Sequence, residues 1–243
     1  MQHQQLQEAA QQGLPEQLVA YIGSARSAGR RVVYIGLGSM LGCMFSSEKA
    51  TAILAVLAGA VLCVQRQQPC CAIIHCATDL AGGAAVLPHP AAIHSSSSSS
   101  SSADSALSAE AAAGPPPYMW LDVPVPHSLL LPLVDLAVHH GGMGTTHAVV
   151  AAGVPALVLP VAQAADQSFW GDIIQRRKAG RLACKPASNI TAEQLAGDLQ
   201  EVLSGLAGFK QAAVALSQQM QKRQGKQAAV KFIQGMLGKA GSS

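Results

Sequence analysis

The segment LAVHHGGMGTT, residues 136–146, joins a strand pattern to a helix pattern through a loop of glycines. Its first residues are apolar up to His139, which predicts a buried strand. Three glycines follow, and the residues from there to about Ala152 predict a helix. That helix is expected to stop at GVP, residues 153–155, and ALVLP at 156–160 predicts the next strand. This order predicts two parallel strands joined by a helix.

Towards the N-terminus, the same alternation of strands and helices continues. RVVYIGL at 31–37 is rich in β-branched residues and opens into Gly38-Ser39, which predicts a buried strand that ends in a glycine loop. A helix is expected from about Pro15, because proline is favoured in the first turn of a helix. The other elements expected on this side are a helix at 46–64, a short strand at 71–75 and an ordered segment that begins at 118–121.

Towards the C-terminus, four helices are expected, at about 167–179, 192–204, 209–223 and 226–237. Strands that alternate with helices across short loops favour a parallel sheet with helices on both faces. The predicted fold class is therefore α/β, with a Rossmann-like, doubly wound parallel sheet.

Two stretches do not fit this alternation. Residues 1–12 are rich in glutamine and are expected to form a polar N-terminal tail, either a frayed helix or a remnant that joins the chain to something upstream. Residues 82–117 are rich in Ser, Ala, Pro and Gly and include an unbroken serine run at 95–102. Such low complexity predicts a disordered surface insertion. We therefore expect one domain, residues 13–240, interrupted by this insertion.

The composition argues against several classes of function. Charged residues make up only 12% of the chain and its net charge is +3, so nucleic-acid binding is not expected. The N-terminus lacks a basic stretch followed by an apolar one, which favours a cytoplasmic location without a secretory signal. The longest apolar run, Ala50–Val64, is shorter than the roughly 18 residues of a membrane span and predicts a buried helix. The six cysteines show no CxxC spacing, so reduced thiols and no metal site are expected.

Ligands of doubly wound sheets bind at the carboxyl ends of the strands, where two glycine loops are predicted. These loops are Gly36-Leu37-Gly38-Ser39 and the segment that begins at His140. Glycines let a phosphate approach the backbone, and the N–H groups at a helix start can bind it. Neither loop is a P-loop or a complete GxGxxG motif. The alternatives are a simple tight turn for the first loop and a hydrogen-bonded histidine that caps the sheet for the second. Asp166-Gln167 suits sugar hydroxyls, with a helix N-cap as the alternative.

The order of the motifs resembles a known family. VVYIGLGSM at 32–40, VPHSLLLPLVDLAVHHGGMGTT at 125–146, AAGVPALVLP at 151–160 and DQSFWG at 166–171 are similar to the C-terminal half of the family 1 UDP-glycosyltransferases. Within that family, the pattern is most similar to the sterol 3-beta-glucosyltransferase branch. The resemblance implies a GT-B fold, in which two Rossmann-like domains face each other and the C-terminal one holds the UDP-sugar. It also implies inverting transfer of a hexose from UDP-glucose to a sterol or other lipid hydroxyl, with no bound metal or other cofactor.

The resemblance also implies roles for individual residues. Gly38 and Ser39 lie near the nucleotide and phosphates, and Val125 with His127 borders the uracil. The residues implied at the diphosphate are His140, Gly142, Gly144 and Thr145, and those implied at the glucose hydroxyls are Asp166 and Gln167. The loop from Pro160 to Asp166 is longer than in the family, which leaves the placement of the last pair open.

The family places its acceptor pocket and its catalytic histidine in an N-terminal domain, which the chain does not contain. No catalytic residue is therefore expected here, and the chain is expected to supply the donor-binding half of an enzyme. The alternatives are a catalytically silent UDP-sugar-binding module, a subunit that needs a partner with the acceptor domain, and an unrelated Rossmann-like protein with another phosphate ligand. The basic segment at 176–178 suits a weak attraction to a membrane surface, where a lipid acceptor would be dissolved.

Overall fold

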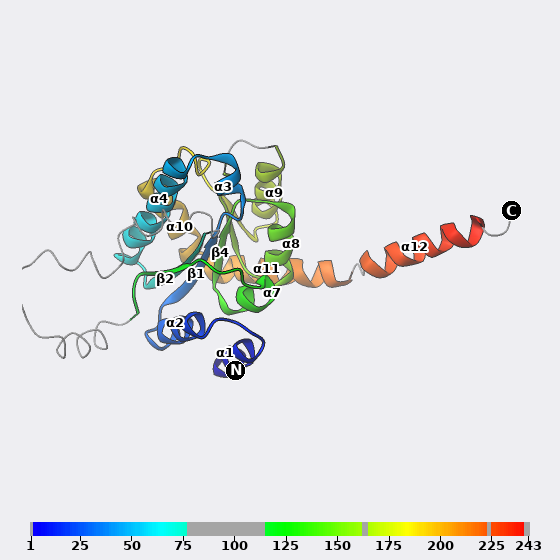
Figure 1. The fold of residues 1–243 in the computed structure, drawn as a ribbon, viewed down its shortest axis with the longest axis horizontal. Coiled ribbons are helices and arrows are strands. Elements are labelled where there is room, and N and C mark those ends of the chain that lie inside the picture. Colours follow the sequence, from blue (N-terminus) through cyan, green and yellow to red (C-terminus); the bar gives the residue numbers. More distant parts are fainter. Residues whose placement is uncertain (1, 77–114, 162–164, 223–224, 241–243) are drawn as a thin grey trace, which may run out of the picture.

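A computed structural model describes residues 2–76, 115–161, 165–222 and 225–240. Its centre is a six-stranded sheet in the order β3-β2-β1-β4-β5-β6, and all neighbouring strands are parallel (Figure 1). The predicted α/β fold with a doubly wound parallel sheet is confirmed. The strands are β1 (Arg31–Gly36), β2 (Cys70–His75), β3 (Tyr118–Leu121), β4 (Leu136–His139), β5 (Ala156–Val158) and β6 (Gly180–Leu182).

One face of the sheet is covered by α3 (Met40–Met44), α4 (Ser47–Gln65) and α10 (Ala192–Ser204). The hydroxyl of Ser46 caps α4 by accepting from the N–H of Lys49, and a capping box of Thr191 and Gln194 starts α10. α4 is long and apolar enough to span a membrane by length and composition alone. Eight of its residues are nevertheless buried, and they pack in the core of this face, as expected for a buried helix.

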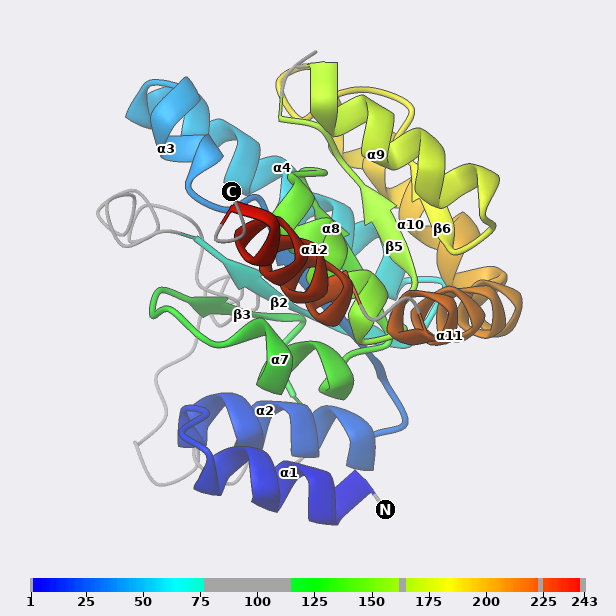
Figure 2. The ribbon, with the colours of Figure 1, turned by 90° about the vertical axis from the view of Figure 1, so that its right-hand side faces the viewer.

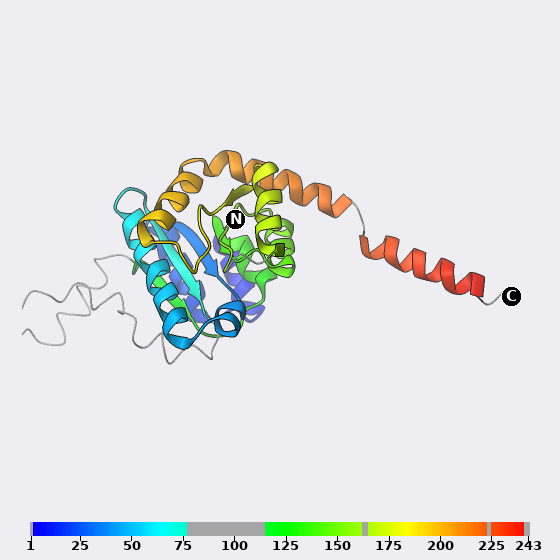
Figure 3. The ribbon, with the colours of Figure 1, turned by 90° about the horizontal axis from the view of Figure 1, so that it is seen from above.

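The other face is covered by helical segments of short and medium length. Because side chains alternate along a strand, Val32 and Tyr34 of β1 point to this face while Val33 and Ile35 point to the first. The covering segments are α2 (Glu16–Ser27), α7 (His127–Leu130), the 3-10 helix η3 (Leu131–Leu133), α8 (Met143–Ala151), α9 (Ala165–Arg176) and α11 (Leu206–Lys222). The last helix, α12 (Gly225–Ala240), extends away from the sheet (Figures 1 and 3).

The polar N-terminal segment, for which a frayed helix was one of the two expected forms, is the helix α1 (Gln2–Gln11). It lies beside α2 (Figure 2), and Leu6 and Ala9 are buried in the core of that face. Cδ1 of Leu6 lies 3.9 Å from the place of a Cβ on Gly23 of α2, which is an ordinary van der Waals distance. Leu6 and Ala9, three positions apart, thus lie on one side of an otherwise polar helix and pack against the core.

The predicted insertion at 82–117 falls largely outside the described residues, which resume at Pro115. Its last three residues pack against the sheet and the helix α2. The carbonyl of Pro117 accepts from the N–H of Ala72 at 3.0 Å, and that of Pro116 accepts from the hydroxyl of Tyr21 at 3.1 Å. The guanidinium of Arg30 donates to the carbonyl of Pro115 at 2.7 Å. These contacts lead the chain directly into β3.

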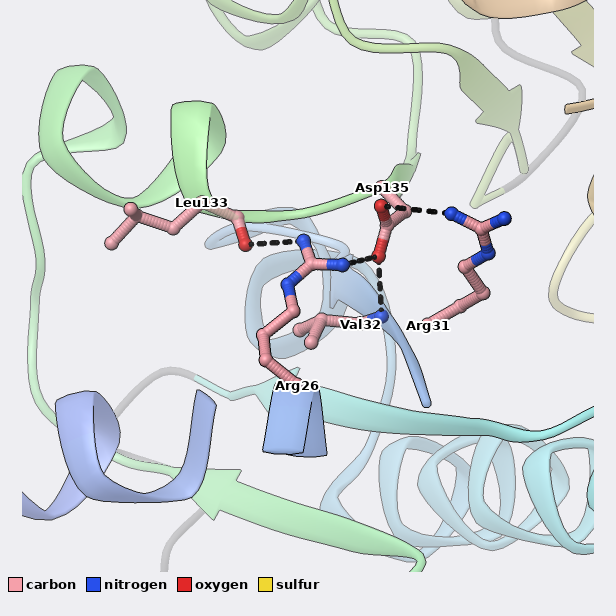
Figure 4. Close-up of polar contacts among 5 residues, drawn as sticks. All are labelled: Arg26, Arg31, Val32, Leu133 and Asp135. Carbon is pink, nitrogen blue, oxygen red and sulfur yellow. Dashed lines mark hydrogen bonds and ion pairs between the residues drawn. The ribbon is translucent and has the colours of Figure 1, made fainter. Parts of the chain in front are cut away.

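Asp135 connects α2, β1 and the start of β4 through one carboxylate (Figure 4). Its Oδ2 accepts from the guanidinium of Arg26 at 2.6 Å and from the N–H of Val32 at 2.7 Å. Arg26 also donates to the carbonyl of Leu133 at 3.1 Å, and Arg31 approaches the other carboxylate oxygen at 3.8 Å. These contacts join α2, β1 and β4 at the amino end of the sheet.

Candidate functional site

The order of the strands places a crevice between the carboxyl ends of β1 and β4. The chain moves outward from β1 to β2 and β3 on one side, and from β4 to β5 and β6 on the other. At such a reversal the connections leave on opposite sides, and ligands of doubly wound sheets bind there. Both predicted glycine loops open into this crevice, because one follows β1 and the other follows β4.

The two loops meet around the ring of His140. A Cβ on Gly38, where φ is +64°, would lie 3.2 Å from Cε1 of His140. A Cβ on Gly142 would overlap Nε2 of the same ring. The glycines therefore make room for this imidazole, while Ser39 stands exposed beside it at the N-cap of α3.

The ring of His140 is 8% exposed, and its buried Nδ1 has no hydrogen-bond partner among the described residues. Burial lowers the pKa of His140, and the nearby carboxylate of Asp166 partly opposes this effect. The ring is therefore neutral at pH 7. A buried polar atom without a partner is costly, so this nitrogen indicates a place for a ligand or a water.

The start of α8 can bind an anion. Gly142 is its N-cap, and the hydroxyl of Thr146 donates to the carbonyl of Gly142 at 2.9 Å. The N–H groups of the first turn, which includes Gly144 and the partly exposed Thr145, have no partner within a helix. A Cβ on Gly144 would meet nothing within 4 Å, so the approach to these groups is open. The positive end of the helix dipole adds to the attraction for negative charge.

The two residues predicted at the sugar hydroxyls differ in exposure: Asp166 is exposed and Gln167 is buried. Asp166 is exposed in the first turn of α9, which begins one residue earlier, so it is not the N-cap of that helix. Gln167 is 2% exposed, and its Oε1 accepts from the N–H of Val161 at 2.8 Å. Its amide oxygen is therefore occupied within the protein. The carboxylate of Asp166 lies close enough to His140 to act against the lowering of the pKa of that ring.

A polar cluster that the sequence did not predict lies beside this crevice. The hydroxyl of Tyr34 is 3.1 Å from Nδ1 of His75 and 3.2 Å from Nε2 of His127. Gly36, the last residue of β1, gives room to the ring of Tyr34. Of the predicted nucleotide-binding residues, His127 belongs to this cluster and Val125 packs against the nearby core. Both histidines are far from the tyrosine in the sequence, by 41 and 93 residues, so no local pattern indicates that they meet.

His139 is the most deeply buried ionisable group described at this edge of the sheet. It is 0% exposed, and its Nδ1 accepts from the N–H of Gly141 at 3.1 Å. Burial lowers the pKa of His139 to about 3, with smaller contributions from His140 and His127. No group of three or more His, Cys, Asp or Glu side chains in the described part of the chain is arranged to hold a metal ion.

We expect the free energy of unfolding to fall between pH 7.5 and pH 5 because of His139. The unfolded ring takes up a proton near pH 6.5 and the buried ring only near pH 3, so the unfolded state binds more protons between these values. This ring alone should lower the stability by about 2 kcal/mol at pH 5, which urea denaturation at the two pH values would measure. His139→Asn keeps an acceptor for Gly141 but cannot titrate, so an equally large fall in this variant would contradict the assignment.

Comparisons with known proteins agree with this architecture. The family described as erythromycin biosynthesis protein CIII-like, C-terminal domain, matches residues 102–235, more than half of the chain. A sterol 3-beta-glucosyltransferase of Aspergillus terreus is 30% identical over 170 residues, which cover 70% of this chain and 10% of that protein. One from Pichia angusta is 31% identical over 196 residues, 77% of this chain and 12% of its own length. The chain thus spans about a tenth of the length of these relatives.

Solved structures share the fold. The spinosyn rhamnosyltransferase SpnG, complexed with spinosyn aglycone, superimposes with a TM-score of 0.54 at 22% identity. The match covers 79% of this chain and 42% of the rhamnosyltransferase. The glycosyltransferase of kitacinnamycin gives a TM-score of 0.51 at 19% identity and covers 85% of this chain and 43% of its own.

These neighbours are GT-B glycosyltransferases, which confirms the resemblance drawn from the motifs. The order of the strands and the family match both indicate a glycosyltransferase domain with a parallel sheet. The chain belongs to the C-terminal domain family of erythromycin biosynthesis protein CIII-like proteins, within the family 1 glycosyltransferases.

Proposed function

We propose that this chain supplies the donor-binding half of a UDP-glycosyltransferase that transfers glucose to a sterol or another lipid alcohol. The observation that carries the proposal is the Nδ1 of His140, which has no partner among the described residues and is held by two glycine loops at the switch point of the sheet. A diphosphate in the crevice would give this ring a partner and would face the open first turn of α8.

Three of the similar proteins support the chemistry of the ligands. The spinosyn rhamnosyltransferase has also been solved with thymidine diphosphate, a nucleoside diphosphate like the one proposed here. The relatives from Aspergillus terreus and Pichia angusta are named sterol 3-beta-glucosyltransferases, which supports glucose as the sugar and a sterol as the acceptor. In the proposed complex the carboxylate of Asp166 accepts hydrogen bonds from the sugar hydroxyls.

In this proposal the chain positions the donor and stabilises the leaving diphosphate through backbone N–H groups and His140, with no metal or other cofactor. The acceptor pocket and the base belong to another domain or chain. The exposed basic residues Arg176, Arg177 and Lys178 would add a weak attraction to an anionic membrane surface that contains the acceptor.

Calorimetric titration of UDP and UDP-glucose into the purified chain tests the donor site. His140→Ala should weaken the binding of both ligands by about 10- to 100-fold, the range of a hydrogen bond to a charged group. Asp166→Ala should weaken only UDP-glucose, by about tenfold. EDTA should leave all affinities unchanged.

Asp172→Ala is the matched control, because Asp172 lies on the same helix as Asp166 and forms a 3.4 Å surface pair with Arg176. It should bind both ligands as the unmodified chain does. A folded chain that binds neither ligand, or that binds ATP and NAD as tightly as UDP, would contradict the proposal.

A further inference from the structure

The amino end of the sheet holds a cavity of about 480 Å³. The first residues of β1 and β2, Arg31 and Cys70, line this cavity. Two further arginines, Arg26 and Arg30, line it as well. All strands of the sheet are parallel, so their amino ends share one edge, and the glycine loops of the proposed donor site lie at the other edge. The cavity is therefore separate from the donor crevice.

Positive charge is in excess at this cavity. Figure 4 shows Arg26 and Arg31 at the two carboxylate oxygens of Asp135, at 2.6 and 3.8 Å. Arg30 forms no ion pair within the described part of the chain, and none of the described residues that line the cavity is acidic. Three guanidinium groups therefore share one carboxylate. The surplus of two positive charges is large for a chain whose net charge is only +3.

A fourth cation lies near the same carboxylate. Burial lowers the pKa of Lys210 on α11, the charge of Asp135 acts against this lowering, and the charge of Arg26 adds to it. The single carboxylate of Asp135 thus faces two arginines and a lysine, which leaves Arg30 without a counter-charge.

Two of the arginines have hydrogen-bond donors to spare. The side chain of Arg31 is 59% exposed, and its guanidinium forms no hydrogen bond within the described residues. The guanidinium of Arg30 uses one N–H group on the carbonyl of Pro115 at 2.7 Å. Each guanidinium has five N–H donors in a planar fork, which matches the oxygens of a phosphate group. Because both side chains line the same cavity, they can bind one anion together.

We propose that this cavity is a second ligand site, which binds a phosphate monoester between Arg30 and Arg31. Such a group carries a charge of about −1.5 to −2 at pH 7, which matches the surplus of two positive charges, and its three oxygens can accept from both guanidiniums. A carboxylate has one negative charge and would neutralise only half of the surplus. The source of the phosphate is a soluble molecule or the headgroup of a lipid, because both present the same chemistry. The site does not depend on the proposed function.

Calorimetric titration of glycerol 3-phosphate into the purified chain tests the site. Arg31→Gln should weaken the binding by about tenfold, because the phosphate loses hydrogen bonds from a charged donor. The side chain is exposed and its nearest carboxylate oxygen is 3.8 Å away, so the variant should fold. Arg31→Lys keeps the charge but not the planar fork, and it should weaken the binding by only about threefold.

Arg66→Gln is the matched control. Arg66 is an exposed arginine at the C-cap of α4, four residues before β2 begins, and it does not line the cavity. Its replacement removes the same charge, and salt screens what remains of its long-range effect, so the affinity should change by less than about twofold.

Two comparisons identify the kind of anion and its place. Glycerate, which has a carboxylate and one negative charge, should bind at least about fivefold more weakly than glycerol 3-phosphate. His140→Ala should leave the affinity for glycerol 3-phosphate unchanged, because His140 lies at the other edge of the sheet. Excess UDP should not displace glycerol 3-phosphate for the same reason.

Sedimentation with vesicles of phosphatidylcholine and phosphatidic acid distinguishes the two sources, because the headgroup of phosphatidic acid is itself a phosphate monoester. Binding of glycerol 3-phosphate that Arg31→Gln weakens indicates a soluble source. Binding of the vesicles alone, again weakened in Arg31→Gln but not in Arg66→Gln, indicates a lipid source.

The inference would be overturned if the unmodified chain bound neither probe, if a folded Arg31→Gln chain bound both as the unmodified chain does, or if glycerate bound as tightly as glycerol 3-phosphate. Binding that is lost in His140→Ala and kept in Arg31→Gln would place the phosphate in the donor crevice. That result would also overturn the inference, while the proposed function would stand. Absence of UDP binding would contradict the proposed function alone.

Discussion

Replacing Gly141 with alanine should lower the free energy of unfolding by about 3 kcal/mol, as measured by urea denaturation. Gly141 has a φ of +88°, where an L side chain is strained. A Cβ there would also lie 2.6 Å from the carbonyl oxygen of Gln167 and 2.9 Å from Cγ1 of Val158. The clash with a backbone atom cannot be relieved by rotating a side chain, so the β4–α8 loop must separate from α9.

Gly144→Ala is the control for this prediction, because it should change the UDP affinity without lowering the free energy of unfolding. Its Cβ would meet nothing within 4 Å, and alanine is favoured over glycine in a helix by up to about 1 kcal/mol. The variant should therefore be as stable as the unmodified chain or more so. Its UDP affinity should nevertheless fall, because the methyl group would occupy the open approach to the first turn of α8. A Gly141→Ala chain as stable as Gly144→Ala would contradict the assigned geometry.

Asp135→Ala should cost about 3 kcal/mol of stability, the loss expected when one partner of a buried ion pair is removed. The guanidinium of Arg26 would keep the carbonyl of Leu133 as a partner, and the N–H of Val32 would lose its acceptor. The side chains of Arg26 and Asp135 are only 21% and 15% exposed, so water compensates little. Thermal or urea denaturation would measure the loss.

Asp172→Ala serves as the reference for a surface carboxylate. Its pair with Arg176 joins side chains that are 48% and 77% exposed, so its loss should change the stability by less than about 0.5 kcal/mol. Equal effects of the two substitutions would show that the contacts of Asp135 add nothing beyond those of an exposed ion pair.

The elements around the site could be predicted because their signals are local. The apolar strands β1 and β4 each run directly into glycines, and parallel strands bring such loops to one edge of a sheet. Other elements left no clear pattern. β6 has the sequence Gly-Arg-Leu and lacks the apolar run that marks the equally short β5. α7 with η3 covers only residues 127–133, so the existence of these elements depends on the neighbours they pack against.

Other features depend on contacts that the sequence does not encode locally. Nothing in the dipeptide Asp166-Gln167 indicates that the glutamine turns inward to Val161 while the aspartate stays exposed. Similarly, Tyr34, His75 and His127 look like isolated residues until β1 pairs with β2 and α7 covers both. Polar residues of this kind gain their roles only from tertiary packing.

Tyr21 and Arg30 make the pairing of β2 with β3 tolerant of changes in the length of the chain between these strands. Through Pro115 and Pro116 they fix the point at which the chain reaches β3, and the pairing of His75 with Leu121 follows from that point. The number of residues between β2 and this point is therefore not what sets the register of the two strands. We therefore expect a change in the number of serines at 95–102 to leave this register unchanged, whereas the same change between β4 and α8 would alter the loop that carries His140 and Gly141.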